Sequence, residues 1–161
     1  MRPICPLLLL LPLTLLLCLP AQAGHTPPKV FLRIYVQTAG EGLPASQATT
    51  ITLPPNGETI QIRTLPEVTE RELIDVKTDL TGDVRLIFNH TGQVSLSAAT
   101  AQNQGRILVL MIDGIVTYAP IIDEQITNGE LDIPSAHPIP AQIIQFLQEV
   151  ARQNVKQAAK T

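Results

Sequence analysis

Two apolar runs flank an Asp-Gly pair near the middle of the chain, and this segment constrains the fold more than any other. Residues 106–112 and 115–118 are rich in β-branched and apolar side chains, and Asp113-Gly114 lies between them. Asp and Gly tolerate the positive φ angles that both central residues of a type I′ turn require. The segment therefore predicts a β-hairpin, and with it an antiparallel sheet.

Alternation of apolar and polar residues predicts further strands on both sides of this hairpin. The predicted strands cover residues 30–37, 51–53, 59–63, 76–80, 84–88 and 130–133. Residues 30–37 alternate in a way that predicts one buried face. A Pro-Pro-Asn-Gly sequence and a Thr-Gly-Asp sequence separate two successive pairs of these strands, which predicts two more hairpins.

One internal segment shows the spacing of a helix. Val94, Ala98 and Ala101 recur at helical intervals, which predicts a helix over about residues 92–104. Thr91 is a candidate N-cap, and Gly105 follows as a residue that readily ends a helix. The small side chains of this stripe favour close packing against a sheet.

Two further segments have helix signals. An apolar stripe from about residue 141 to 157 follows Pro140, which suits the first turn of a helix. Residues 69–72, Thr-Glu-Arg-Glu, have the form of a capping box and predict a helix of one or two turns. The whole pattern predicts an α+β fold, with a mostly antiparallel β-sheet and helices packed on one face.

The first 23 residues have the pattern of a secretory signal peptide. A leucine-rich stretch with no charged residue covers residues 7–19, and Ala21-Gln22-Ala23 provides small residues for cleavage. An uncleaved anchor and a lipid anchor at Cys18 are the alternatives. Cleavage would remove both cysteines, leaving an exported, periplasmic or secreted domain with no disulfide and no stable membrane span.

The composition argues against several classes of function. Eleven Lys and Arg residues face fourteen Asp and Glu residues, and the chain has no Trp, so we expect no nucleic-acid partner. The three histidines are too dispersed for a metal motif. Residues 40–45 superficially resemble a dinucleotide fingerprint, but Pro44 and the β-branched residues that follow disfavour the required helix. We therefore expect no cofactor, no metal and no catalytic residues.

Five carboxylates in the second half of the chain are candidates for a calcium site or an acid-base pair. They are Asp113, Asp123, Glu124, Glu130 and Asp132. Their spacing does not match a calcium loop. Asp113 is explained by its turn, and strand alternation turns Glu130 and Asp132 toward solvent.

A collinear series of motifs resembles the head subdomain in the first large periplasmic region of SecD, a protein-export membrane component. The series runs through residues 100–106, 107–112, 113–114, 119–122 and 126–129, and residues 68–73 and 84–92 match upstream. The resemblance covers roughly residues 65–157. Together with the leader pattern, it predicts a division into a signal peptide (1–23), an N-terminal strand and hairpin region (24–64), a SecD head-like domain (65–157) and a tail (158–161).

The resemblance implies a fold and a surface that contacts polypeptide, without the coupling elements of the family. SecD heads are thought to contact a preprotein that emerges from the translocation channel. After the leader this sequence shows no membrane-spanning segment that would carry a proton, and Pro134-Ser135 replaces a glycine usual in the family. We therefore expect a non-enzymatic domain.

The candidate peptide-contact surface is an apolar set around the central hairpin turn of Asp113 and Gly114. Its residues are Ile115, Tyr118, Ile121, Ile122 and Ile126. The expected partners are unfolded or translocating polypeptide, or components of the Sec translocon. Two alternatives stay open: these residues simply complete the core, or the domain is an envelope scaffold or oligomerisation module.

Overall fold

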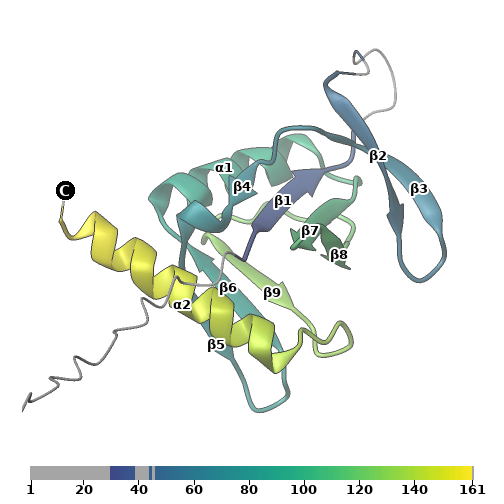
Figure 1. The fold of residues 1–161 in the computed structure, drawn as a ribbon. Coiled ribbons are helices and arrows are strands. Elements are labelled where there is room, and N and C mark those ends of the chain that lie inside the picture. Colours follow the sequence, from purple (N-terminus) through teal and green to yellow (C-terminus); the bar gives the residue numbers. More distant parts are fainter. Residues whose placement is uncertain (1–29, 39–43, 45, 161) are drawn as a thin grey trace, which may run out of the picture.

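The central hairpin lies in a sheet built from strands that are far apart in the sequence. The structure is a computed structural model and describes residues 30–38, 44 and 46–160. The strands of this sheet are β1 (Leu32–Val36), β4 (Val68–Thr69), β7 (Leu108–Ile112) and β8 (Ile115–Tyr118). They lie in the order β4-β1-β7-β8, with every pair antiparallel (Figure 1). Asp113 and Gly114 have φ angles of 51° and 81°, which confirms the predicted turn.

Two smaller antiparallel sheets complete the β structure. β5 (Leu73–Thr78), β6 (Val84–Phe88) and β9 (Glu130–Ile133) form a three-stranded sheet in the order β5-β6-β9. β2 (Ala48–Leu53) and β3 (Glu58–Arg63) form a separate hairpin. The predicted α+β class with mostly antiparallel strands is confirmed.

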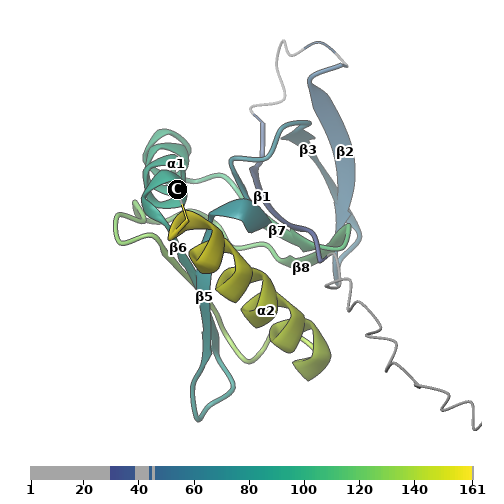
Figure 2. The same ribbon diagram turned by 60° about the vertical axis from the view of Figure 1, so that its left-hand side comes forward.

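The helical elements are α1 (His90–Gln102), α2 (Ala141–Ala158) and the single 3₁₀ turn η1 (Glu70–Glu72). The capping box predicted for η1 is present, because Glu72 Oε2 accepts from the Thr69 amide at 2.8 Å and from its hydroxyl at 2.6 Å. Figure 2 shows both helices on one side of the four-stranded sheet and the β2–β3 hairpin on the other. This arrangement confirms that the helices pack on one face.

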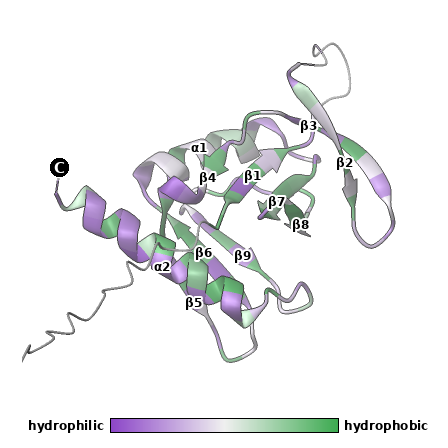
Figure 3. Cartoon of the chain, in the orientation of Figure 1, coloured by the Kyte–Doolittle hydropathy of each residue, from purple (hydrophilic) through white to green (hydrophobic). Residues whose placement is uncertain are grey.

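The two central strands of the four-stranded sheet, β1 and β7, have buried residues on both faces, which differs from the prediction for residues 30–37. Leu32, Ile34 and Leu110 face the main core, together with the three-stranded sheet and both helices. Tyr35 and Val109 face a second, smaller core against β3. Tyr35 is only 7% exposed, because the β2–β3 hairpin covers the face that alternation assigned to solvent. β7 and β8 accordingly appear mostly in the hydrophobic colour in Figure 3.

The boundaries and buried face of α1 differ from the sequence prediction. Its N-cap is Asn89, whose side chain accepts from the Gly92 amide at 3.0 Å, and not Thr91. Val94 is 53% exposed, whereas Leu96 is fully buried in the main core. The predicted packing stripe was therefore wrong, because small and polar residues surround the whole helix and leave its buried face to be set by long-range contacts.

α2 agrees with the predicted span and also closes one edge of the three-stranded sheet. Leu147 and Ala151 are buried in the main core. The Gln148 side-chain amide donates to the Val76 carbonyl at 3.1 Å, and the Asn154 amide donates to the Leu73 carbonyl at 2.8 Å. The helix thus satisfies outward carbonyls of β5, the edge strand, as a covering element is expected to do.

Val155 is an exception on the predicted stripe of α2. It is 49% exposed. In Figure 1 the C-terminal end of α2, where this residue lies in the sequence, extends beyond the sheet.

Several predictions fall partly or wholly outside the described residues. The signal peptide at 1–23 lies outside them, as do residues 40–43 and 45 of the fingerprint-like stretch. No helix within the described part of the chain is long and apolar enough to cross a membrane.

β1 lies between β4 and β7. The sheet thus contains strands from both sides of the predicted domain boundary between residues 64 and 65. That boundary marks where the resemblance to the SecD head begins, and it stays a prediction.

Candidate functional site

A groove of about 450 Å³ lies between β9 and the segment that follows β8. Its lining residues are Thr100, Leu108, Tyr118, residues 120–128 and residues 130–132. Leu108, Ile122 and Leu131 are buried apolar residues beneath it. Four of the lining residues carry carboxylates, and none is Lys, Arg or His, so we name it the acidic groove.

Three side chains of α1 hold one wall of the acidic groove. The Gln93 amide donates to the Thr127 carbonyl at 2.7 Å. Ser97 Oγ accepts from the Gln125 amide at 2.8 Å, and the buried Thr100 hydroxyl accepts from the Ile126 backbone amide at 2.9 Å. These contacts fix the segment after β8 in one position and so preorganise the groove.

Sequence reasoning missed these three anchoring residues. Gln93, Ser97 and Thr100 are spaced by four and three positions, so they lie on one face of the helix. A polar stripe of this kind was a usable signal. Apolar spacing alone does not reveal such a stripe, because its side chains are polar.

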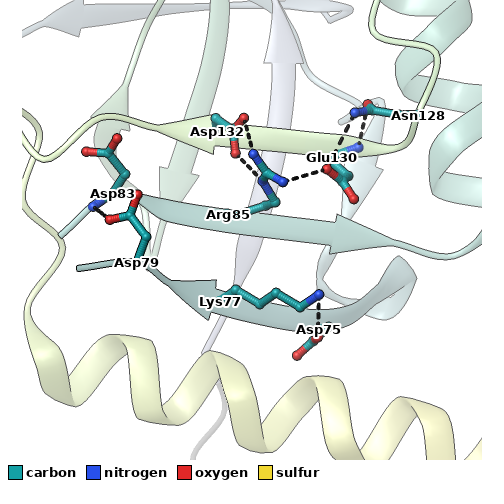
Figure 4. Close-up of polar contacts among 8 residues, drawn as sticks. All are labelled: Asp75, Lys77, Asp79, Asp83, Arg85, Asn128, Glu130 and Asp132. Carbon is teal, nitrogen blue, oxygen red and sulfur yellow. Dashed lines mark hydrogen bonds and ion pairs between the residues drawn. The ribbon is translucent and has the colours of Figure 1, made fainter. Parts of the chain in front are cut away.

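The opposite wall carries an ion-pair network on the outer face of β6 and β9. Arg85 Nε lies 2.6 Å from Asp132 Oδ1 and its Nη2 lies 3.0 Å from Asp132 Oδ2. Its Nη1 lies 3.2 Å from Glu130 Oε2 (Figure 4). The two carboxylates stabilise the cation, with the Asp132 hydrogen bond foremost, and raise the pKa of Arg85. The Arg85 guanidinium thus forms ion pairs with two of the four groove carboxylates.

The remaining carboxylates give the groove a negative field. Asp123 and Glu124 are exposed on the segment after β8. Burial raises the pKa of the Tyr118 hydroxyl, and the charges of Asp123 and Asp132 raise it further. Both walls therefore contribute negative charge at the tyrosine.

A second groove, of about 390 Å³, lies along residues 115–117 of β8. Its walls are β8 itself and residues 136–140 with Ile143, and apolar residues such as Val116 and Ile139 dominate it. We name it the apolar groove. The Tyr118 and His137 rings, whose centroids are 5.0 Å apart, lie where the segment before α2 passes the end of β8.

The five residues of the predicted contact surface do not form one patch. Ile115 is 71% exposed and lines the apolar groove, whereas Ile121 is 66% exposed and lines the acidic groove. Tyr118 and Ile126 are partly buried against the main core and also line the acidic groove. Ile122 is only 4% exposed and belongs to the core, so its side chain is not available on a surface.

Asp113 has a structural role beyond its turn. Its carboxylate accepts from the Phe31 amide at 2.9 Å, and its own amide donates to the Phe31 carbonyl at 2.8 Å. It therefore ties the turn to the start of β1. Asp113 does not line the acidic groove, and the described residues contain no group of three or more His, Cys, Asp or Glu suited to holding a metal ion.

Comparisons with known proteins identify the fold. No protein-family model and no curated protein matches the chain. Among solved structures, SecDF in its super-membrane-facing form matches with a TM-score of 0.54 and 22% identity, covering 76% of this chain and 18% of that one. A structure of SecDF, described as a membrane component that enhances protein export, matches with a TM-score of 0.54 and 21% identity, covering 78% of this chain and 63% of the other.

The chain thus spans less than two thirds of the length of each of these two SecDF chains. Its fold is SecDF-like, which confirms the resemblance noted in the sequence.

Proposed function

We propose that this chain is a non-enzymatic, export-associated domain that binds extended polypeptide along the segment from Ile115 to Ile126. In this role it acts outside the cytoplasm after loss of its leader, on unfolded or translocating chains or on Sec translocon components. The fold supports the export role by analogy, since the matched SecDF is described as enhancing protein export.

The observation that carries the proposal is a pair of grooves, one lined by residues 115–117 of β8 and the other by Tyr118 and the segment that follows β8. Large apolar side chains are usually withdrawn from solvent when they serve only the core. Ile115 and Ile121 are the two members of the predicted surface whose side chains are mostly exposed, at 71% and 66%. Ile115 lines the apolar groove and Ile121 lines the acidic groove. Apolar side chains beside a strand edge suit an extended segment, which offers alternating side chains and unpaired backbone groups.

In-cell crosslinking tests this proposal. A photoreactive amino acid replaces Ile121 in one variant and Leu80 in a control, because Leu80 is fully exposed in the β5–β6 turn and lines neither groove. We expect adducts with translocating chains or translocon subunits from position 121 and none from position 80. Equal labelling from both positions, or recovery of neither class of partner from position 121, would refute the proposal.

A further inference from the structure

β9 is the uncovered edge of the three-stranded sheet, and its hydrogen-bonding pattern can be assigned. The Phe88 amide donates to the Gly129 carbonyl at 2.9 Å, so these two residues face each other across the ladder. Backbone groups in an antiparallel ladder point alternately toward and away from the partner strand. Leu131 therefore bonds toward β6, and the backbone groups of Glu130 and Asp132 point away from it.

Most of the outward groups on β9 are open to a new partner. The Glu130 amide donates to the Asn128 side chain at 3.0 Å, which confirms its outward direction and occupies it. The Asp132 amide and carbonyl and the Glu130 carbonyl also point outward by the same alternation. All three belong to residues that line the acidic groove. The opposite edge of this sheet is covered, because Gln148 and Asn154 of α2 bind the carbonyls of β5.

The charge of the groove specifies what a strand placed there should carry. Four carboxylates line the groove, and the single guanidinium of Arg85 pairs with two of them. Side chains directly opposite each other on adjacent antiparallel strands interact, and opposite charges are favourable. Glu130 and Asp132 lie on the outer face of β9, whereas Leu131 and Ile133 face the core. A neighbouring strand thus meets carboxylates on one face and apolar residues on the other.

We propose that an extended segment with alternating basic and apolar residues adds to the outer edge of β9 inside the acidic groove. This deepens the proposed function, on which it rests, by naming the class of polypeptide and the strand that receives it. Basic side chains of the segment lie beside the groove carboxylates, and its amides and carbonyls pair with those of Asp132 and Glu130.

Titration of the purified protein with defined peptides tests the strand pairing, and binding is measured by the changes in backbone amide chemical shifts. The probe is a short peptide in which lysine and valine alternate. A second peptide has the same sequence with every other backbone amide methylated, which removes donors on one edge while keeping all side chains. We expect the Asp132 amide resonance to shift with the first peptide, and the methylated peptide to bind about tenfold more weakly, since one or two hydrogen bonds are lost.

Two variants at one position separate backbone pairing from charge. Asp132→Ala removes the carboxylate and keeps the backbone amide, whereas Asp132→Pro removes both. Proline is tolerated on an edge strand when its missing N–H faces outward. Neither replacement side chain can accept a hydrogen bond from Arg85, so the comparison isolates the backbone N–H. We expect Asp132→Pro to bind about tenfold more weakly than Asp132→Ala.

The charge preference has its own matched control. A peptide with glutamate in place of lysine should bind at least tenfold more weakly than the lysine peptide. Added salt should reduce this difference in affinity, because it screens the charges. Joint replacement of Asp123→Asn and Glu124→Gln should weaken the lysine peptide several-fold. Asp75→Asn removes a carboxylate on β5, outside the groove, and should leave binding unchanged.

The outcomes distinguish the two proposals. Equal affinity for the methylated and unmethylated peptides, or for the lysine and glutamate peptides, overturns strand addition at β9 even if apolar peptides still bind elsewhere. The methylated peptide acts on the unaltered protein, so this result does not depend on the folding of Asp132→Pro. Absence of binding by every peptide, together with failed crosslinking at position 121, overturns the proposed function as well.

Discussion

Replacing Gly92 with alanine should destabilise the protein, although alanine is the better helix former. A Cβ atom at position 92 would lie 2.8 Å from the Cβ of Glu72 and 2.8 Å from the Cβ of Phe88. Both neighbours are first side-chain atoms fixed to the backbone, so neither can move aside alone. Overpacking of this kind costs about 1–3 kcal/mol.

The same substitution also affects the start of α1. The Gly92 amide donates to Asn89, and the Asn89 amide donates to the Glu72 carbonyl at 2.8 Å, so a displaced helix loses part of its cap. Loss of a cap costs about 1 kcal/mol, and alanine returns about 1 kcal/mol through helix propensity. We therefore expect Gly92→Ala to lower the free energy of unfolding by about 2 kcal/mol.

Urea denaturation followed by circular dichroism measures this difference. Ala98→Gly is the matched control, since Ala98 is exposed on the same helix and should lose only the propensity, about 1 kcal/mol. Alanine is thus expected to be favourable at position 98 and unfavourable at position 92. Unchanged or higher stability of Gly92→Ala would refute the close approach of α1 to η1 and β6.

Other positions give three further tests. Asn89→Ala should lower the free energy of unfolding by about 1 kcal/mol in urea, and Thr91→Ala should have little effect, because only Asn89 caps α1. Gly114→Ala should cost about 1 kcal/mol in the same assay, because φ at this position is 81°. The Thr81 hydroxyl, foremost among several donors, lowers the pKa of Asp79 below its ordinary value of 3.8. The ionised carboxylate therefore stabilises the β5–β6 turn at pH values above 3.8, and this stabilisation is lost as the pH falls through the lowered pKa. An NMR titration of the Asp79 carboxyl should show the lowered pKa, and Thr81→Ala should bring the pKa back toward 3.8.

Local chemistry made much of the fold predictable. The hairpin at Asp113-Gly114, the capping box at residues 69–72 and the last helix depend on residues close together in the sequence, and the structure has all three. Turn and cap residues satisfy backbone groups within a few positions of themselves, so their signals survive without knowledge of the tertiary fold. The SecDF-like fold could be predicted because several short motifs between residues 68 and 129 occur in the same order as in the SecD head.

The site was less predictable because distant residues build it. The groove wall depends on Gln93 bonding to Thr127, 34 positions away, and the tie between Phe31 and Asp113 crosses 82 positions. Alternation assigned Tyr35 to solvent, because a period of two cannot show that a second hairpin covers that face. Ile122 was grouped with its apolar neighbour Ile121 on the contact surface, but the structure shows that Ile122 completes the core, which was the alternative left open.

The amides of Gln148 and Asn154 have a consequence for how many partners the three-stranded sheet can recruit. A sheet with two open edges propagates, because each added chain presents a fresh template to the next. Here α2 blocks growth from β5, so two copies joined edge to edge at β9 would leave neither three-stranded sheet an open side. Pairing at the β9 edge of this sheet therefore ends at a single junction, which predicts a one-to-one stoichiometry for assembly at that edge.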